Sequence, residues 1–176
     1  DGYRQALESG QHVVKSLVTE PNTKLYVDWR PYIGHPTTAN ADTGLDLAKL
    51  KELGTRMCAL PEGFVLQRQV QKIYDDRRLM AAAATPVNWG FAELLAYASL
   101  LEEGFLVRLT GQDVARGTFS HRHAVLHNQN DGGVHVPLQH LGEAQAPFDI
   151  HDSLLSELAV LGFEYGYATT TPNALI

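Results

Sequence analysis

The second half of the chain alternates between helix-like and strand-like segments, and this alternation constrains the fold more than any other feature. Apolar residues recur at helical spacing over residues 86–103 and again over 153–168. Residues 105–109 have the composition of a buried strand, and residues 173–176 open another one. Helices that alternate with strands predict an α/β fold with a parallel sheet. In such a sheet ligands bind beyond the carboxyl ends of the strands, which here begins at Thr110.

The first 84 residues follow a different pattern, which predicts separate helices joined by irregular chain. A short helix is expected before Gly10, then an apolar run at 13–18 and an irregular connector at 21–44. Apolar spacing indicates two longer helices, over 47–57 and 65–84. The positions expected to be buried on the helices at 65–84 and 86–103 are Val70, Ile73, Leu79, Met80, Trp89, Ala92, Leu95, Ala96 and Leu100.

The composition indicates a globular protein and excludes several classes. Hydrophobic residues make up 44% of the 176 residues and charged residues 19%, which argues against disorder. The net charge is −6 and no basic run is present, so we expect no nucleic-acid partner. The mainly apolar stretch 94–101 is too short to cross a membrane. A single cysteine, Cys58, excludes an internal disulfide and a cysteine-ligated zinc site, and we expect a soluble protein of a reducing compartment.

Both ends of the chain are unusual for a natural terminus. The chain starts at Asp1 without a methionine, and it stops in an apolar run, 174–176, where a buried strand is expected to open. Natural termini are usually exposed and polar. We therefore expect the chain to be a piece of a longer polypeptide.

Six of the eight histidines lie between residues 121 and 151, which raises the question of a metal site. His123 and His127 are four residues apart and could share a helix face, but no companion glutamate is present and Arg122 is an unfavourable neighbour for a cation. We favour the interpretation that these imidazoles donate to backbone carbonyls and order a long loop. A nucleophilic Ser120–His121 pair is disfavoured, because no strand-turn-helix surrounds the serine.

Glu157 is the acidic residue most suggestive of chemistry. It lies in the first turn of an otherwise apolar helix, so we expect its carboxylate to be at least partly buried. Burial and a helix N-terminus act in opposite directions on a carboxyl group, and this opposition is typical of acid/base residues. The alternative, which the residues alone favour, is a helix-start glutamate in a capping arrangement with Ser153 or Ser156.

Several motifs, in the same order along the chain, resemble one enzyme family. They are LPEGF (60–64), residues 89–101, TGQDVARGTFSHRH (110–123), VLHNQ (125–129), SLLSE (153–157), GFEYGYA (162–168) and PNAL (172–175). Together they resemble the thiamine-dependent, decarboxylating first component of 2-oxoglutarate dehydrogenase and its close relative that acts on 2-oxoadipate. The resemblance covers nearly the whole chain and is densest over 86–176.

The resemblance implies a thiamine-diphosphate-binding fold. Residues 85–176 would be the first part of the aminopyrimidine-binding, transketolase-like domain, and residues 1–84 an inter-domain connector with helices. Enzymes of this family are several times longer and hold thiamine diphosphate between the subunits of a homodimer. The ligands of the magnesium ion and of the diphosphate group would lie outside this chain, so no metal ligand is expected within it.

The resemblance also implies an activity and two site residues. The activity is oxidative decarboxylation of 2-oxoglutarate, with transfer of the succinyl group to a lipoyl group of dihydrolipoyl succinyltransferase, in the tricarboxylic acid cycle. Glu157 matches the catalytic, cofactor-binding glutamate that hydrogen-bonds the aminopyrimidine ring, and Gln112 matches a cofactor-binding glutamine. The expected location is the cytoplasm in a bacterium or the mitochondrial matrix in a eukaryote.

Three alternatives stay open at this point. The same chemistry could act on 2-oxoadipate, because substrate choice depends on residues outside this segment. The isolated chain could be a non-catalytic structural half-domain. The histidine cluster could belong to a non-enzymatic metal or ligand module, which metal analysis of the purified chain would reveal.

Overall fold

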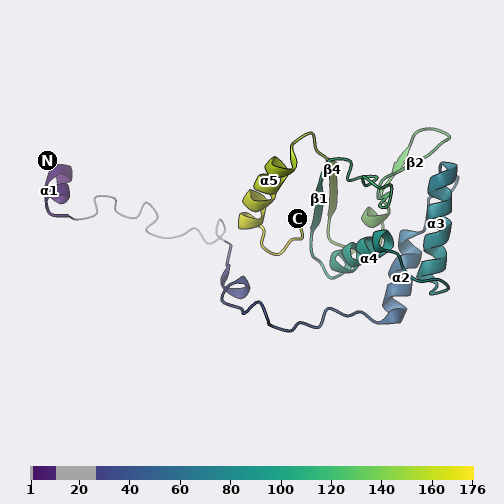
Figure 1. Cartoon of the computed structure of the whole chain (residues 1–176), viewed down its shortest axis with the longest axis horizontal. Helices are drawn as coiled ribbons and strands as arrows, with labels where there is room; N and C mark the ends of the chain where they lie inside the picture. The colour runs from purple at the N-terminus through teal and green to yellow at the C-terminus, as the bar shows by residue number, and fades with distance from the viewer. Residues whose placement is uncertain (1, 11–26) are drawn as a thin grey trace. The chain divides into compact units, whose positions relative to one another are not determined.

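A computed structural model describes residues 2–10 and 27–176 of the chain (Figure 1). By their internal contacts, the residues form two compact units, 1–34 and 35–176, which are described separately. Within the described ranges no helix is long and apolar enough to cross a lipid bilayer.

The first unit contains little regular structure. Helix α1 (Gly2–Glu8) ends before Gly10, as the sequence predicts. A 3-10 turn, η1 (Arg30–Tyr32), is the regular element in the described part of the predicted irregular connector. The apolar run predicted at 13–18 lies outside the described residues.

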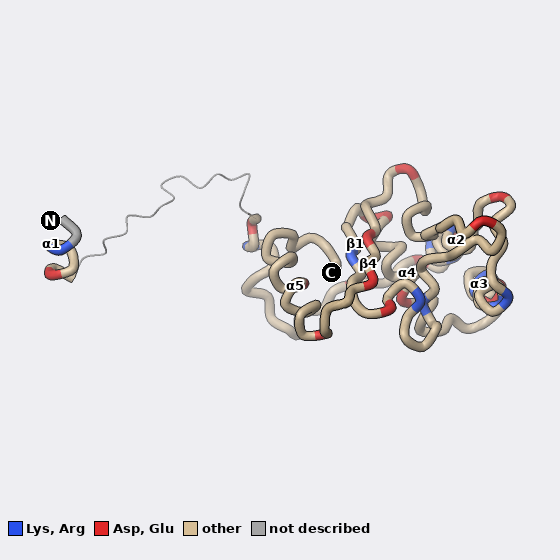
Figure 2. Tube along the Cα trace, turned by 90° about the horizontal axis from the view of Figure 1, so that it is seen from above, with Lys and Arg blue, Asp and Glu red and all other residues tan. Residues whose placement is uncertain are grey.

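The second unit is an α/β structure built on two parallel strands. Its elements are α2 (Leu47–Met57), α3 (Arg68–Ala81), α4 (Trp89–Glu102), β1 (Val107–Gly111), β2 (Leu126–His127), β3 (Val134–His135), η2 (Pro137–Gln139), β4 (Phe148–Asp152) and α5 (Glu157–Thr170). Strands β1 and β4 pair in parallel from Val107↔Phe148 to Gly111↔Asp152. Leu175 adds a parallel bridge to Val107 on the other edge of β1. The predicted parallel sheet is confirmed, and α5 lies on one side of it with α2, α3 and α4 on the other (Figures 1 and 2).

Strand β4 was not predicted: its five residues lie between a long segment rich in glycine and polar residues, which ends at about Pro147, and the predicted helix at 153–168. Its sequence, Phe-Asp-Ile-His-Asp, alternates apolar and polar side chains, and Phe148 is buried while Asp152 is exposed. Alternation over so few residues is a weak signal, but it is the pattern of a half-buried strand. The pairing with β1 is what identifies these residues as a strand.

The ends of the helices follow local rules. The Asn88 side chain accepts a hydrogen bond from Phe91 N at 2.9 Å and begins α4, and Gly104, with φ +92°, follows its last turn. The Gln67 side chain accepts from Gln69 N at 2.7 Å at the start of α3. Polar side chains thus replace the intrahelical partners that the first amides of each helix lack.

The core lies between α2, α4 and the sheet. Its most buried large side chains include Leu53, Phe91, Leu101 and Val107. A Cβ atom added to Gly54 of α2 would lie 2.8 Å from Ala81 Cβ of α3, so glycine allows these two helices to approach closely. The two helices therefore share a core with α4. The division of the chain near residue 84 remains a prediction.

The predicted buried faces of α3 and α4 were wrong in part. On α4 the predicted positions Trp89 and Ala96 are exposed, Trp89 by 92%, while Phe91, Leu94, Ala98 and Leu101 are buried. Because α4 is apolar nearly all round, spacing alone does not identify the face that packs. On α3 the buried residues are Tyr74, Arg77 and Ala81, whereas Leu79 is 48% exposed.

Charged residues connect α2 to α4. Glu102 at the end of α4 accepts from Lys49 Nζ at 2.7 Å and from Arg56 Nη1 at 3.0 Å. Lysine, arginine and acidic residues are interspersed along α2 and α3 (Figure 2). Such partly exposed pairs contribute little stability individually, but here two of them share one carboxylate.

Candidate functional site

The site predicted from the sequence lies at the carboxyl edge of the parallel sheet. Gln112 follows β1 directly, and its Nε2 donates to the Leu155 carbonyl at 3.2 Å, two residues before α5 begins at Glu157. Ser153 N donates to the Gly111 carbonyl at 2.7 Å and extends the connection between the two strand ends. The fold thus brings the loop that carries Gln112 against the loop that leads to Glu157.

Helix α5 is capped at its start by serine. Ser156 Oγ accepts from Ala159 N at 3.4 Å, and Ser153 Oγ accepts from Leu155 N at 3.1 Å. Glu157 is the first residue of the helix, so its carboxylate is placed at the positive end of the helix dipole. Of the predicted capping alternatives, Ser156 is therefore the N-cap.

The predicted partial burial of Glu157 was wrong. The side chain is exposed, and so are its apolar neighbours Leu154, at 102%, and Leu158, at 80%. None of the fourteen described residues of α5 is buried. Apolar neighbours in the sequence do not create an apolar environment when the helix that carries them covers so little of the core.

The motif at 110–123 forms a loop that is anchored to α4 by an ion pair. Arg122 Nε and Nη2 donate to the two carboxylate oxygens of Glu93 at 2.8 and 2.9 Å, and Arg122 Nη1 donates to the Val114 carbonyl at 2.9 Å. Burial raises the pKa of Glu93, but the hydrogen bonds and charge of Arg122 outweigh it and leave that pKa lowered. Through these bonds Arg122 connects Glu93 of α4 to the backbone at Val114, two residues after Gln112.

Helix α3 holds the backbone of the same loop. The buried Arg77, 2% exposed, donates from Nη2 to the carbonyls of His121 at 3.0 Å and Arg122 at 2.5 Å. Tyr74 Oη donates to the His123 carbonyl at 3.0 Å. Apolar spacing could not find these residues. The signal in the sequence that could have indicated them is their spacing: Tyr74 and Arg77 are three residues apart and so share one face of α3.

The histidines take part in ordering the loops, as the favoured interpretation predicted. The imidazole of His123 is hydrogen-bonded to the backbone of Ser120, and that of His135 to the backbone of Ala59. His140 Nδ1 lies 2.9 Å from the Val136 carbonyl oxygen. The larger share of the anchoring at 121–123, however, comes from the arginine and tyrosine of α3.

The geometry does not place His123 and His127 on one helix face. His123 has a positive φ of 42° in a loop, and His127 is in strand β2. Across the ranges 2–10 and 27–176, no group of three or more His, Cys, Asp or Glu side chains could hold a metal ion. Ser120 Oγ accepts from Arg116 Nη1 at 3.3 Å, which is a structural contact.

Close packing of the motif loop requires two glycines. A Cβ atom at Gly90 would lie 2.5 Å from the His121 carbonyl oxygen, and one at Gly117 would lie 2.5 Å from His121 Cε1. Asp113, Ser120 and His123 have φ values between 42° and 54°, a region that non-glycine residues rarely adopt. Such strained positions cluster near functional sites and are held by their surroundings.

Two cavities border this edge of the sheet. One, of about 370 Å³, lies between the motif loop and the start of α3, and Asp113, Arg116, His123 and Asp152 line it. Burial, followed by the charges of Arg77 and Arg116, lowers the pKa of His123. The other, of about 280 Å³, lies between the sheet and α5.

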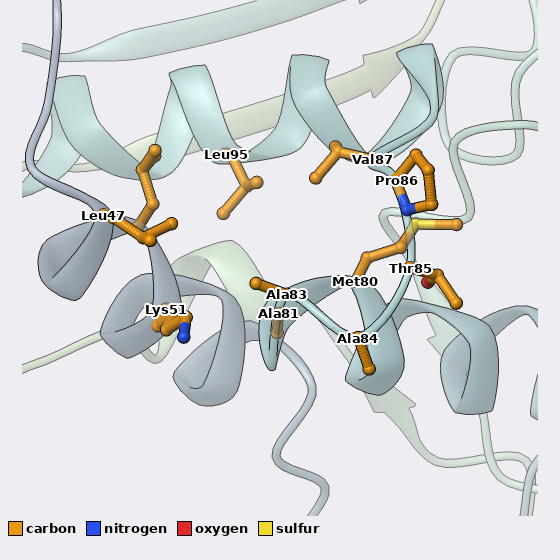
Figure 3. A pocket seen from close by; sticks show the side chains of 11 residues that line it. Leu47, Lys51, Met80, Ala81, Ala83, Ala84, Thr85, Pro86, Val87 and Leu95 are labelled. Atoms are coloured by element: carbon orange, nitrogen blue, oxygen red, sulfur yellow. The ribbon is translucent and has the colours of Figure 1, made fainter.

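A third cavity, of about 400 Å³, is poor in chemical groups. It lies between the start of α2, the end of α3, the connection at 83–87 and the middle of α4, and Figure 3 shows aliphatic side chains around it with Lys51 as the charged member. Met80 and Leu95 line opposite walls, from α3 and α4. We do not place the site there, because it lacks converging polar groups.

Comparison with known proteins identifies the family. Residues 85–176, more than half of the chain, match the pyrimidine-binding domain of transketolase. The chain belongs to this family. The resemblance noted in the sequence and the thiamine-type α/β fold that it implies are thereby confirmed.

Three relatives of this chain are each named as a 2-oxoglutarate dehydrogenase or its E1 component. The chain is 63% identical, over its whole length, to the 2-oxoglutarate dehydrogenase E1 component of Azotobacter vinelandii, and 51% identical to that of Coxiella burnetii. A mitochondrial 2-oxoglutarate dehydrogenase of Schizosaccharomyces pombe is 48% identical over 76% of the chain and 13% of that protein. The chain spans 19% of the length of the two bacterial relatives.

Proposed function

We propose that this chain supplies the aminopyrimidine-binding part of a 2-oxoglutarate dehydrogenase E1 component that depends on thiamine diphosphate. The observation that carries the proposal is the 63% identity over all 176 residues to the Azotobacter vinelandii E1 component. The arrangement of Gln112 and Glu157 at the carboxyl edge of a parallel sheet, where ligands of such folds bind, supports it.

The residues present fit one end of the cofactor. Glu157 offers an exposed carboxylate at a helix N-terminus, and Gln112 offers an amide from the neighbouring loop. The exposed Leu154 and Leu158 supply apolar surface on either side of that carboxylate. An aromatic ring with nitrogen atoms at its edge needs this combination of hydrogen-bonding groups and apolar surface.

Glu157 is proposed to hold and move a proton at a ring nitrogen of the bound aminopyrimidine. A carboxyl group can donate to that nitrogen when protonated and take the proton back when ionised. Gln112 is proposed to bind the same ring region, and its amide adds no charge beside the carboxylate. When bound, thiamine diphosphate supplies an electron sink for decarboxylation of a 2-oxo acid.

Magnesium and diphosphate are proposed to be bound by residues outside this chain. The described residues contain no cluster of three or more His, Cys, Asp or Glu suited to a metal ion, so no step through a metal is assigned to them. We further propose a homodimer, with dihydrolipoyl succinyltransferase and its lipoyl domain as the partner that accepts the succinyl group. The compartment is proposed to be the cytoplasm or the mitochondrial matrix, since relatives of both bacterial and mitochondrial origin are known.

The test is a chimera in which this chain replaces the matching 176 residues of the Azotobacter vinelandii protein. We expect the chimera to decarboxylate 2-oxoglutarate in the presence of thiamine diphosphate and magnesium, at a rate near that of the parent. A folded chimera that is inactive on 2-oxoglutarate would contradict the proposal.

A further inference from the structure

Arg108 is the second residue of β1, and its charged side chain reaches helix α5. Its guanidinium carbon lies 5.1 Å from the ring centroid of Phe163 and 5.4 Å from that of Tyr167. These two residues are one helical turn apart on α5, and their rings lie 5.8 Å from each other. Arg108 therefore contacts two successive turns of α5, the helix that begins with Glu157.

The rest of α5 is attached weakly to the unit. None of its described residues is buried, and Leu161 and Tyr165 are 60% and 78% exposed. At the start of the helix, the hydrogen bond from Gln112 to the Leu155 carbonyl fixes the chain just before it. After the helix, Leu175 exchanges backbone hydrogen bonds with Leu106 and Arg108. These bonds hold the segments on either side of α5 but not the helix itself, and the contacts of the Arg108 side chain restrict rotation of the helix about its axis.

Arg108 is not well explained as a residue that stabilises the sheet. Its Nη1 lies 3.8 Å from Asp149 Oδ2 on the paired strand, which is a long ion pair. Its Nε and the hydroxyl of Thr110 are buried without a hydrogen-bond partner among the described residues. Both side chains border the cavity of about 280 Å³ between the sheet and α5. A buried donor without a partner lowers stability, so an aliphatic residue would suit this strand better.

We propose that Arg108 is a positioning residue for Glu157. By stacking on Phe163 and Tyr167 it fixes the rotation and the axial position of α5, and with them the direction of the carboxylate at the start of the helix. Arginine suits this task because its planar group packs on aromatic faces while remaining charged. The proposal rests on the proposed function of Glu157.

The experiment uses the chimera with the Azotobacter vinelandii protein and two measurements. One is the rate at which the reactive thiazolium proton of bound thiamine diphosphate exchanges with deuterium. The other is the dissociation constant of the cofactor. We expect Arg108→Met to slow the exchange about tenfold or more while the dissociation constant changes less than about threefold. Arg108→Lys, which keeps the charge without the planar face, should fall between Arg108→Met and the wild type.

Two further variants make the test specific. Arg68→Met removes an exposed arginine from the start of α3 and serves as the matched control, with an exchange rate like the wild type. Phe163→Leu removes one ring from a half-exposed position, so it should fold even if Arg108→Met does not, and it should also slow the exchange. The effects of Arg108→Met and Phe163→Leu should be less than additive, because both remove the same contact.

The outcomes separate this inference from the proposed function. If Glu157→Gln slows the exchange but folded Arg108→Met and Phe163→Leu do not, the positioning role is wrong and the function of Glu157 stands. If Glu157→Gln has no effect, the proposed function fails first. A fall in exchange that is matched by an equal loss of cofactor affinity would show that Arg108 merely stabilises the fold, and would overturn the proposal.

Discussion

The side-chain amide of Gln112 donates a hydrogen bond to the backbone carbonyl of Leu155 at 3.2 Å, so the residue after β1 directly contacts the loop before α5. The amide oxygen of Gln112 accepts no hydrogen bond from the described residues. Gln112 can therefore hold the loop with its nitrogen and present its oxygen to a ligand. This division of roles links the position of Glu157 to the residue that is proposed to share its ligand.

Substitution of Gln112 tests this link. Gln112→Glu should weaken binding of thiamine diphosphate to the chimera about tenfold or more, because it removes the donor to Leu155 and adds a negative charge near Glu157. Gln112→Asn shortens the side chain without adding charge and should have a smaller effect. Titration calorimetry measures both affinities. If Gln112→Glu and the wild type bind thiamine diphosphate with equal affinity, Gln112 does not contact the cofactor.

The close contact between α4 and the motif loop predicts the effect of a single methyl group. Gly90→Ala would place Cβ 2.5 Å from the His121 carbonyl oxygen, so it should lower the free energy of unfolding by about 1–3 kcal/mol. Gly162→Ala on α5 meets nothing within 4 Å and should raise it by about 0.5–1 kcal/mol. Urea denaturation of the two variants measures the difference. A Gly90→Ala variant as stable as the wild type or more stable would mean that the contact with His121 is absent.

The ion pair between Glu93 and Arg122 predicts how acid acts on the chain. The pKa of Glu93 is lowered from its usual 4.5, because the effects of Arg122 outweigh that of burial. Its contribution to stability is therefore complete above pH 4.5 and is lost as the pH falls through the lowered pKa. Glu93→Gln should cost about 1.5–3 kcal/mol at pH 7 and flatten the loss of stability in acid. Denaturation from pH 7 to pH 3 tests this, and an unchanged acid profile in the variant would contradict it.

A second pH dependence follows from the contact between the rings of His135 and His140, whose centroids are 4.7 Å apart. Burial, followed by the charge of His140, lowers the pKa of His135 from its usual 6.5. The unfolded chain then binds more protons, so stability should fall as the pH decreases below 6.5. His135→Asn should reduce this dependence between pH 7 and pH 5. A variant with the slope of the wild type would exclude His135 as the cause.

The sequence predicts the order of the elements better than their faces. The helix at 47–57 is found where the apolar spacing places it, and the sheet is parallel as predicted, although its strand β4 was not predicted. The packing face of α4 could not be predicted, because a helix that is apolar all round has no preferred side in its sequence. The burial of Arg77 on α3 could not be predicted either. A buried arginine that donates to backbone carbonyls is indistinguishable in sequence from a solvated one.

Gln112 and Glu157 remain predicted site residues, and the predicted environment of Glu157 was wrong. Gln112 and Glu157 come from loops that the structure joins at one edge of the sheet. The exposure of Glu157 depends on how α5 packs, and apolar neighbours in the sequence misrepresent it. The residues that anchor the site, Glu93 and Arg122, are 29 positions apart, and no local pattern connects them.

The most direct test of the account is the effect of Glu157→Gln on exchange of the thiazolium proton of thiamine diphosphate bound to the chimera. An amide has the size of the carboxyl group but cannot exchange a proton with the ring nitrogen, so the exchange rate should fall about 10²–10⁴-fold. Glu164→Gln, about two turns further along the same helix, is the matched control and should exchange like the wild type. If Glu157→Gln exchanges at the wild-type rate, Glu157 is only a helix-start residue, and the proposed role of this site is wrong.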